Sequence, residues 1–135
     1  MKLLLDINVI LDVVLGREPW LNEASRLLSA LEDREAEGYV AAHTITTIHY
    51  IVAREKGRQT AAQAVSDVLR VVRVVPITSA DFQQALVLGI SDFEDAVQAV
   101  AALQIGADYL ITRNTKDFKA SPVEVRTPGE ALAMF

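Results

Sequence analysis

Cysteine is absent from this sequence of 135 residues. Disulfide bonds and metal sites built from thiolates are therefore excluded. There are only two histidines, His43 and His49, so a histidine-rich metal site is not favoured. No apolar run approaches the ~18 residues of a membrane span. Asp6 follows only three leucines, which is not the pattern of a signal peptide. We expect a cytoplasmic protein without a membrane partner.

Positive charge is also scarce. The chain has 13 lysines and arginines against 18 aspartates and glutamates, a formal net charge of −5. This balance argues against a large basic surface for nucleic acid, although a metal ion held by acids would invert the local field. The remaining composition, 51% hydrophobic and 23% charged, is ordinary for a globular protein. We expect one domain over residues 1–135 with a core of its own.

Short apolar runs alternate with helical patterns along the chain. The runs predict strands at residues 2–5, 39–42, 71–75, 109–111 and 123–125. Helical patterns lie between them, at 7–15, 19–31, 45–52, 61–69, 80–86 and 92–105, with a last helical turn at 127–130. Such alternation implies right-handed βαβ units, so the predicted fold class is α/β, with a central parallel sheet of four to five strands covered on both faces.

Several helix starts carry residues that suit an N-cap. Ser91 followed by Glu94 fits a capping box and predicts a helix that begins at Asp92. The other expected caps are His43 with Thr44, Thr60 and Ser79.

Acidic side chains fall at matched places in this pattern. Asp6 follows the first predicted strand and Asn114 follows the strand at 109–111, with Asp117 in the loop beyond. In open α/β sheets, ligands bind at the carboxyl ends of the strands. Asp92 and Asp95 share a face at a helix start, because residues three apart are neighbours on a helix. The sequence therefore predicts one acidic pocket.

Three or four carboxylates held together repel one another unless a cation lies between them. Mg²⁺ and Mn²⁺ prefer such oxygen ligands. A metal held in this way lowers the pKa of a bound water and stabilises the charge of a phosphoryl displacement. Metal-assisted hydrolysis of a phosphodiester is the predicted chemistry. Asp95 is the most informative member, because it lies between the apolar Phe93 and Val97 and a buried acid needs a partner.

Each of these residues also has a structural interpretation. Asp6 is equally explained as a loop residue, Asp92 as a partner of the helix dipole, and Asn114 as a turn residue. Thr112 is explained as a strand end and Asp117 as turn chemistry. Other polar residues have structural interpretations too. Asn8 is interpreted as a helix cap or a partner of Asp6, and Arg17 and Arg113 as solvated charges or phosphate contacts. Asp12 is interpreted as a solvated residue and His49 as a core or edge histidine.

Three segments, LLLDINVILDVVLGREPW, DFEDAVQAVAA and YLITRNTKDF, together resemble the PIN domain, the nuclease fold of VapC-type toxins. Asp6, Asn8, Asp12 and Arg17 resemble the opening of a PIN subgroup with a D-x-N-x-x-x-D pattern. The resemblance implies a three-layer α/β/α sandwich, a Mg²⁺ or Mn²⁺ pocket and endoribonuclease activity on single-stranded RNA. It also implies an antitoxin partner that blocks the pocket, and a homodimer.

The resemblance assigns roles to individual residues. Asp6 and Asp95 match the acids that hold the principal metal. Asp92 and Asp117 match further ligands or water-orienting groups, so the implied metal set is Asp6, Asp95, Asp92 and Asp117. Thr112 and Asn114 match groups that contact the metal's waters or the scissile phosphate. Either Asn114 or Asp117 takes the place of the family's last acid or amide.

One position departs from the family pattern. The family usually has a Glu at the end of a T-x-x-E segment. The corresponding segment here is Thr44-Ile45-Thr46-Thr47, so Thr47 stands in place of the Glu and the pocket has one negative charge fewer. The resembled subgroup often lacks this Glu. Two alternatives to a nuclease stay open: a degenerate PIN-like module that binds RNA or a protein without cleavage, and an aspartyl-phosphate protein with Asp6 as nucleophile and Lys116 nearby.

Overall fold

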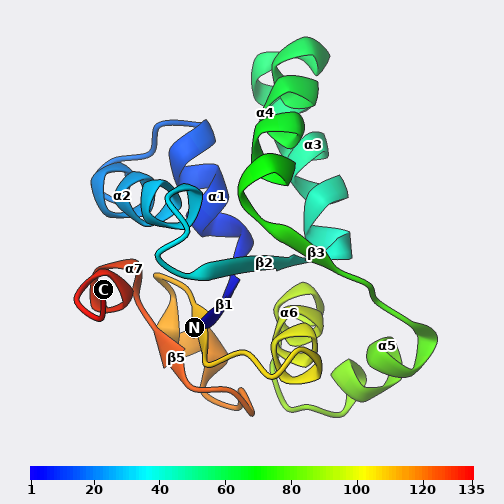
Figure 1. Cartoon of the computed structure of the whole chain (residues 1–135). Helices are drawn as coiled ribbons and strands as arrows, with labels where there is room; N and C mark the ends of the chain where they lie inside the picture. Colours follow the sequence, from blue (N-terminus) through cyan, green and yellow to red (C-terminus); the bar gives the residue numbers. More distant parts are fainter.

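Five parallel strands form one central sheet in the computed structural model, which describes residues 1–135 (Figure 1). Their order across the sheet is β3-β2-β1-β4-β5. The strands are β1 (Lys2–Leu5), β2 (Glu37–Ala41), β3 (Arg73–Val75), β4 (Tyr109–Ile111) and β5 (Val125–Arg126). The predicted α/β class and parallel sheet are confirmed.

Helices cover both faces of the sheet. They are α1 (Ile7–Val14), α2 (Leu21–Glu32), α3 (Ala42–Lys56), α4 (Arg58–Val71), α5 (Ser79–Leu86), α6 (Phe93–Gln104) and α7 (Pro128–Leu132), with a 3₁₀ turn, η1, at Thr115–Phe118. Figure 1 shows α1 to α4 on one side of the strands and α5 and α6 on the other, which is the expected three-layer α/β/α sandwich. None of these helices combines the length and apolar character needed to cross a membrane.

The alternation of side chains along the strands decides which face each site residue reaches. In β1, Leu3 and Leu5 belong to the core beneath α1 to α4, whereas Leu4 packs into the core beneath α6. In β4, Ile111 lies in the first core and Leu110 in the second. Successive residues of a strand point to opposite faces, and this alternation continues into the residue after β1 and the two residues after β4. Asp6 and Thr112 therefore point toward α6, and Arg113 points toward α1.

The central ladder places Asp6 beside Thr112. Leu5 pairs with Ile111 across β1 and β4. The ladder continues one step further, because the Asp6 N–H donates to the Ile111 carbonyl at 2.9 Å. The carboxyl ends of the two central strands thus leave the sheet side by side.

The caps of α6 and α5 lie one residue away from their predicted positions. Asp92, not Ser91, caps α6: its backbone is extended and its carboxylate accepts a hydrogen bond from the Asp95 N–H at 3.0 Å. Thr78, not Ser79, caps α5 in a capping box with Asp81. In both helices the residue that turns the chain is extended and carries an acceptor side chain, as an N-cap requires.

Three of the other boundary errors have a common cause, because the helices extend further than their apolar stripes. Helix α3 begins at Ala42 without a side-chain cap, so His43 and Thr44 lie inside it. Gly57, with φ at +91°, turns the chain directly from α3 into α4, so Thr60 is not a cap. Because α4 continues to Val71, β3 starts only at Arg73. The last strand is Val125–Arg126 rather than residues 123–125.

Candidate active site

Asp6 lies at the centre of the candidate site and is 1% exposed. Both oxygens of its carboxylate accept hydrogen bonds. Thr112 Oγ1 donates to Oδ2 at 2.8 Å, and Gln98 Nε2 donates to Oδ1 at 3.0 Å. Burial raises the pKa of Asp6, while the bonds from Thr112 and Gln98 favour its charged form and act in the opposite direction. A buried carboxylate is thus held by two neutral side chains from β4's end and α6.

Gln98 is a site residue that the sequence analysis did not single out. It is 1% exposed, and its nitrogen also lies 3.3 Å from Asp95 Oδ1. Its amide oxygen accepts the Ile7 N–H at 2.9 Å, which orients the amide with its nitrogen toward the two acids. The available signal was position: Gln98 is the one polar residue in a run of alanines and valines, three residues after Asp95.

Thr112 and Asn114 are linked at the end of β4. The hydroxyl of Thr112, which donates to Asp6, accepts the Asn114 N–H at 3.0 Å. Asn114 is half-buried and is the cap residue of η1, where its carbonyl accepts the Asp117 N–H at 3.0 Å. The turn that the sequence assigned to Asn114 is therefore present, and it carries Asp117 toward the start of α6.

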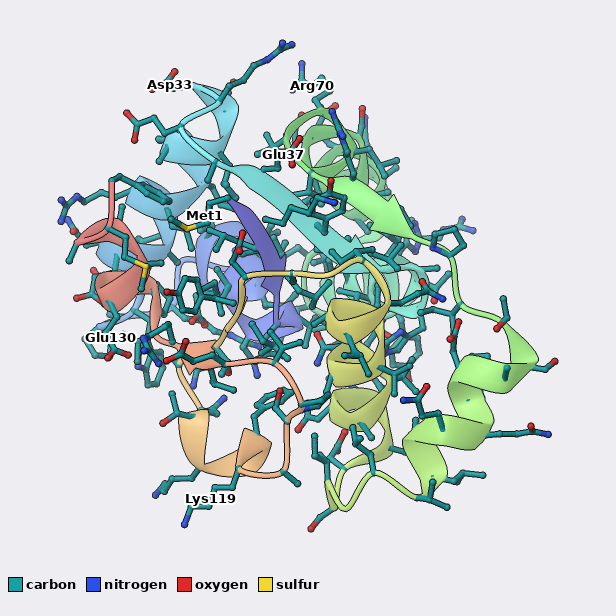
Figure 2. All side chains as sticks on the ribbon, turned by 60° about the horizontal axis from the view of Figure 1, so that its bottom comes forward. Met1, Asp33, Glu37, Arg70, Lys119 and Glu130 are labelled. Atoms are coloured by element: carbon teal, nitrogen blue, oxygen red, sulfur yellow. The ribbon has the colours of Figure 1, made fainter.

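The other predicted acids lie around an open cleft of about 380 Å³. Its wall combines the start of α6, with Asp92 and Asp95, and the turn η1, with Lys116, Asp117 and nearby Lys119. Figure 2 shows Lys119 projecting outward at the end of this turn. Asp6, Thr112 and Asn114 do not line the cleft. The predicted residues thus form two layers, an exposed acidic rim and a buried Asp6 behind it, and the amide of Gln98 joins the two.

Asp95 carries the largest electrostatic perturbation at this cleft. Burial, followed by repulsion from the carboxylates of Asp6, Asp92, Asp117 and Glu94, raises the pKa of Asp95 to about 7. No lysine or arginine is within salt-bridge distance of Asp95. The expected repulsion among acids is therefore present, and positive charge at this point would relieve it.

Helix α3 contributes no acid to the site. The hydroxyl of Thr47 donates to the His43 carbonyl at 3.1 Å, within its own helix. His43 Nε2 lies 3.2 Å from the Glu94 carbonyl oxygen, and burial lowers the pKa of His43. A lowered pKa keeps this imidazole neutral at pH 7, so His43 joins α3 to the first turn of α6 without adding charge.

The residues of the opening motif after Asp6 do not reach the carboxylate of Asp6. Asn8 Oδ1 accepts from Arg17 Nη1 at 3.3 Å, so Asn8 neither caps a helix nor binds Asp6. The interpretation of Asp12 as a solvated residue is wrong: it is 1% exposed and binds Arg113 through both carboxylate oxygens.

The carboxylates at the cleft fit a hard divalent cation that takes only one or two ligands from the protein. No three acids or histidines lie close enough to form a complete cage. Mg²⁺ is ordinarily held by one or two carboxylates and keeps several waters, so a full cage is not required. Asp95 on an open cleft, backed by Asp6, offers such a partial site.

The match to a family model decides where the chain belongs. Residues 2–116 match the PIN domain. This chain belongs to the PIN domain family. The nuclease character of that family agrees with the acidic cleft. No curated protein matches the chain in sequence.

Solved structures of toxin–antitoxin proteins share this PIN fold. VapBC2 from Rickettsia felis, bound to a promoter DNA fragment, is similar with a TM-score of 0.74 and 16% identity over 94% of this chain and 98% of that chain. VapC20 of Mycobacterium tuberculosis, a toxin that cleaves the sarcin–ricin loop, has a TM-score of 0.74 and 19% identity over 92% and 98%. A toxin–antitoxin complex from Klebsiella pneumoniae has a TM-score of 0.68 and 26% identity over 93% and 96%.

Proposed function

We propose that this PIN protein is a metal-dependent endoribonuclease that hydrolyses phosphodiester bonds in single-stranded RNA and is the toxin of a toxin–antitoxin pair. The observation that carries the proposal is Asp95. Its carboxyl group lines an open cleft, and burial, followed by repulsion from the carboxylates of Asp6, Asp92 and Asp117, raises its pKa to about 7. Such a concentration of negative charge attracts a divalent cation and is unfavourable without one.

The chain's own residues have separate tasks in this proposal. Asp95 and Asp6 would hold Mg²⁺ or Mn²⁺, with Asp92 and Asp117 as further ligands or water-orienting groups. Thr112 fixes the Asp6 carboxylate through its 2.8 Å hydrogen bond. Asn114 ties Thr112 to the turn that carries Asp117. When bound, the metal would lower the pKa of a water and stabilise charge on the scissile phosphate.

RNA would approach over the rim of the cleft. Lys116 and Lys119 are exposed there, opposite Asp92 and Asp95. Ammonium groups attract phosphates without regard to base sequence, so they suit the backbone of a single strand. The net charge of −5 then has little bearing on this local contact.

Cleavage of end-labelled single-stranded RNA tests the proposal. The reactions would contain Mn²⁺, Mg²⁺ or EDTA, with wild type and Asp95→Asn side by side. Asp67→Asn is the matched control, because this aspartate lies on α4 with a half-exposed side chain. Metal-dependent cleavage by wild type and the control, lost in Asp95→Asn, is the expected result. Equal cleavage by all three proteins would contradict the assignment.

A PIN module that binds RNA without cutting it is the second candidate. Thr47 favours this candidate, because it stands where the family usually has a Glu and its hydroxyl is hydrogen-bonded within α3. Metal-independent RNA binding by folded protein, with no cleavage under any condition, would favour this candidate. The aspartyl-phosphate alternative is not favoured, because Lys116, the lysine that it needs beside the nucleophile, lines the acidic cleft, whereas Asp6 does not.

A groove on the opposite face suits the proposed antitoxin. It has a volume of about 700 Å³ between α1, α2 and α4, with apolar walls that include Val14 and Leu28 and acidic Glu32 and Asp67 at its edge. We propose that a helix of the antitoxin binds there through an apolar stripe flanked by basic residues, while another part of the antitoxin blocks the acidic cleft. Leu28→Lys should abolish co-purification with the antitoxin, whereas Leu69→Lys, an exposed residue of α4, should not.

The proposed homodimer has a candidate surface on α5 and the start of α6. Phe82, Leu86, Val87 and Phe93 are exposed there, and the Phe82 and Phe93 rings are stacked with centroids 6.1 Å apart. Exposed apolar residues gathered in this way are typical of association surfaces. Light scattering should show a dimer that Leu86→Glu converts to a monomer, while Leu69→Glu leaves it intact. A wild-type monomer would exclude this surface.

A further inference from the structure

Asp12 and Arg113 form an ion pair that the proposed chemistry does not use. Arg113 Nε donates to Asp12 Oδ2 at 2.7 Å, and Nη2 donates to Oδ1 at 3.2 Å. The side chain of Asp12 is 2% exposed and that of Arg113 is 18% exposed. A two-point contact between guanidinium and carboxylate fixes both distance and orientation, so it joins α1 rigidly to the end of β4.

Trp20 completes this arrangement. The guanidinium carbon of Arg113 lies 3.7 Å from the centroid of the indole ring, which is the distance of a stacked cation–π contact. Arg17 is secondary, since its Nη1 lies 3.8 Å from Asp12 Oδ1 and also donates to Asn8. The guanidinium is thus bonded along one edge and covered on one face.

In the sequence, Arg113 lies between Thr112 and Asn114, two residues of the candidate active site. Thr112 points toward α6 and donates to Asp6, whereas the side chain of Arg113 extends to α1 on the other face of the sheet. The last bond of the sheet in this segment is from the Thr112 N–H to the Arg126 carbonyl at 3.0 Å. Beyond it, Asn114 is attached only by local bonds to Thr112 and Asp117. The Arg113 side chain adds a tether from this segment to α1, beside the hydrogen bond from Thr112 to Asp6 and the burial of Phe118 at the end of η1.

We propose that Asp12, Arg113 and Trp20 form a clamp that positions Thr112 and Asn114 against Asp6. In this assignment Arg113 is a positioning residue, and its guanidinium pairs with the Asp12 carboxylate rather than with a substrate phosphate. The catalytic consequence rests on the proposed nuclease function, whereas the positioning itself does not. The clamp also accounts for Asp12 and Trp20 in the opening segment, neither of which reaches the acidic cleft.

The test removes both charges together, because a single change would leave a buried charge without a partner. The variant Asp12→Asn/Arg113→Gln is compared with Glu37→Gln/Arg73→Gln, which likewise neutralises both members of an exposed ion pair, between β2 and β3. Hydrogen exchange is measured on metal-free protein. The Asn114 and Asp117 amides should exchange about tenfold faster or more in the clamp variant only, as expected for local opening. Unchanged exchange at these amides would overturn the proposal.

A second variant guards against a failure of the double mutant to fold. Trp20→Ala removes the covered face and keeps the ion pair, whereas Trp20→Phe retains an aromatic face. Faster exchange at Asn114 and Asp117 in Trp20→Ala, restored in Trp20→Phe, is the expected pattern. An equal rise at all amides in both Trp20 variants would instead indicate a general loss of stability and would count against a clamp.

Kinetics then separate positioning from substrate contact. If wild type cleaves RNA, the clamp variant should lose about tenfold or more in kcat with KM nearly unchanged, since ground-state binding is retained. A raised KM with a weaker salt dependence and normal exchange would make Arg113 a phosphate contact and overturn the proposal. If wild type does not cleave RNA, the proposed function fails, while the exchange result still decides the clamp.

Discussion

The side-chain amide of Gln98 joins Asp6 to Asp95. Its nitrogen donates to Asp6 Oδ1 at 3.0 Å and to Asp95 Oδ1 at 3.3 Å. Its oxygen is already bonded to the Ile7 N–H, so the amide presents both of its hydrogens to the acids. A neutral side chain thereby donates hydrogen bonds to two carboxylates that repel each other.

Replacement of Gln98 with Met should therefore destabilise the metal-free protein more than the metal-bound protein. Met has a similar length but leaves the Ile7 N–H, Asp6 Oδ1 and Asp95 Oδ1 without the hydrogen bonds that Gln98 makes, a cost of about 1–3 kcal/mol. The thermal midpoint in EDTA should fall, and Mn²⁺ should raise it more in Gln98→Met than in wild type. Gln63→Met is the control, because Gln63 bonds only the exposed Asp67. Equal midpoint losses with and without Mn²⁺ would reduce Gln98 to a packing role.

The stability of the metal-free protein should depend on the ionisation of Asp95. Its pKa is about 7 in the folded state against 3.8 ordinarily, so between these values the folded state binds more protons than the unfolded state. Stability should therefore fall as the pH rises from about 4 to about 7. Thermal unfolding in EDTA across this range should show a flatter slope for Asp95→Asn than for wild type. A parallel slope in the two proteins would contradict the shift.

The affinity for Mn²⁺ should rise with pH over the same interval. A metal binds the deprotonated carboxylate, so it must displace the proton that Asp95 holds below pH about 7. Isothermal titration should show affinity that increases by up to about tenfold per pH unit below that value and then levels off. Asp95→Asn should bind weakly at every pH. An affinity that is independent of pH would place the ion elsewhere.

Asp81 is a buried acid with a purely structural role, which allows a clean stability test. It is 8% exposed and accepts hydrogen bonds from the Thr78 N–H, the Thr78 hydroxyl and Gln104. Asp81→Ala should lower the free energy of unfolding by about 1–3 kcal/mol, through loss of the cap and an unpaired Gln104. Metal affinity should be unchanged. Glu130→Ala, in the exposed capping box at Thr127, should have a smaller effect on denaturant unfolding.

The sequence predicted the fold because its signals are local. Apolar runs such as residues 109–111 and helical stripes between them correspond to the observed order of elements. The caps were misplaced by one residue at Asp92 and Thr78, since each is next to a serine, Ser91 or Ser79, of similar capping ability and only the backbone angles distinguish the neighbours. The extent of α4 was underestimated because its first residues, Arg58 to Thr60, are polar and carry no hydrophobic signal, and because the β-branched Val71 was assigned to the following strand.

The candidate site was predictable to the level of residue types at strand and helix ends. Asp6 and Thr112 were candidates because they follow parallel strands, whose carboxyl ends lie at one edge of the sheet, and Asp95 because it lies between apolar neighbours near a helix start. The linkage by Gln98 and the pairing of Asp12 with Arg113 were not, because these contacts span 92 and 101 residues of sequence. No local pattern states which polar side chain will be buried opposite which acid.

The sequence by itself determined the elements, their order and the acids at their ends, because hydrophobic periodicity and backbone propensity act over a few residues. Tertiary structure alone decided that Asp6 is buried behind Asp95 and that Gln98 lies between them. It also decided that Arg113 turns away to α1. These outcomes depend on strand alternation and on the desolvation of each charge, and both are fixed only when the sheet closes against α1 and α6.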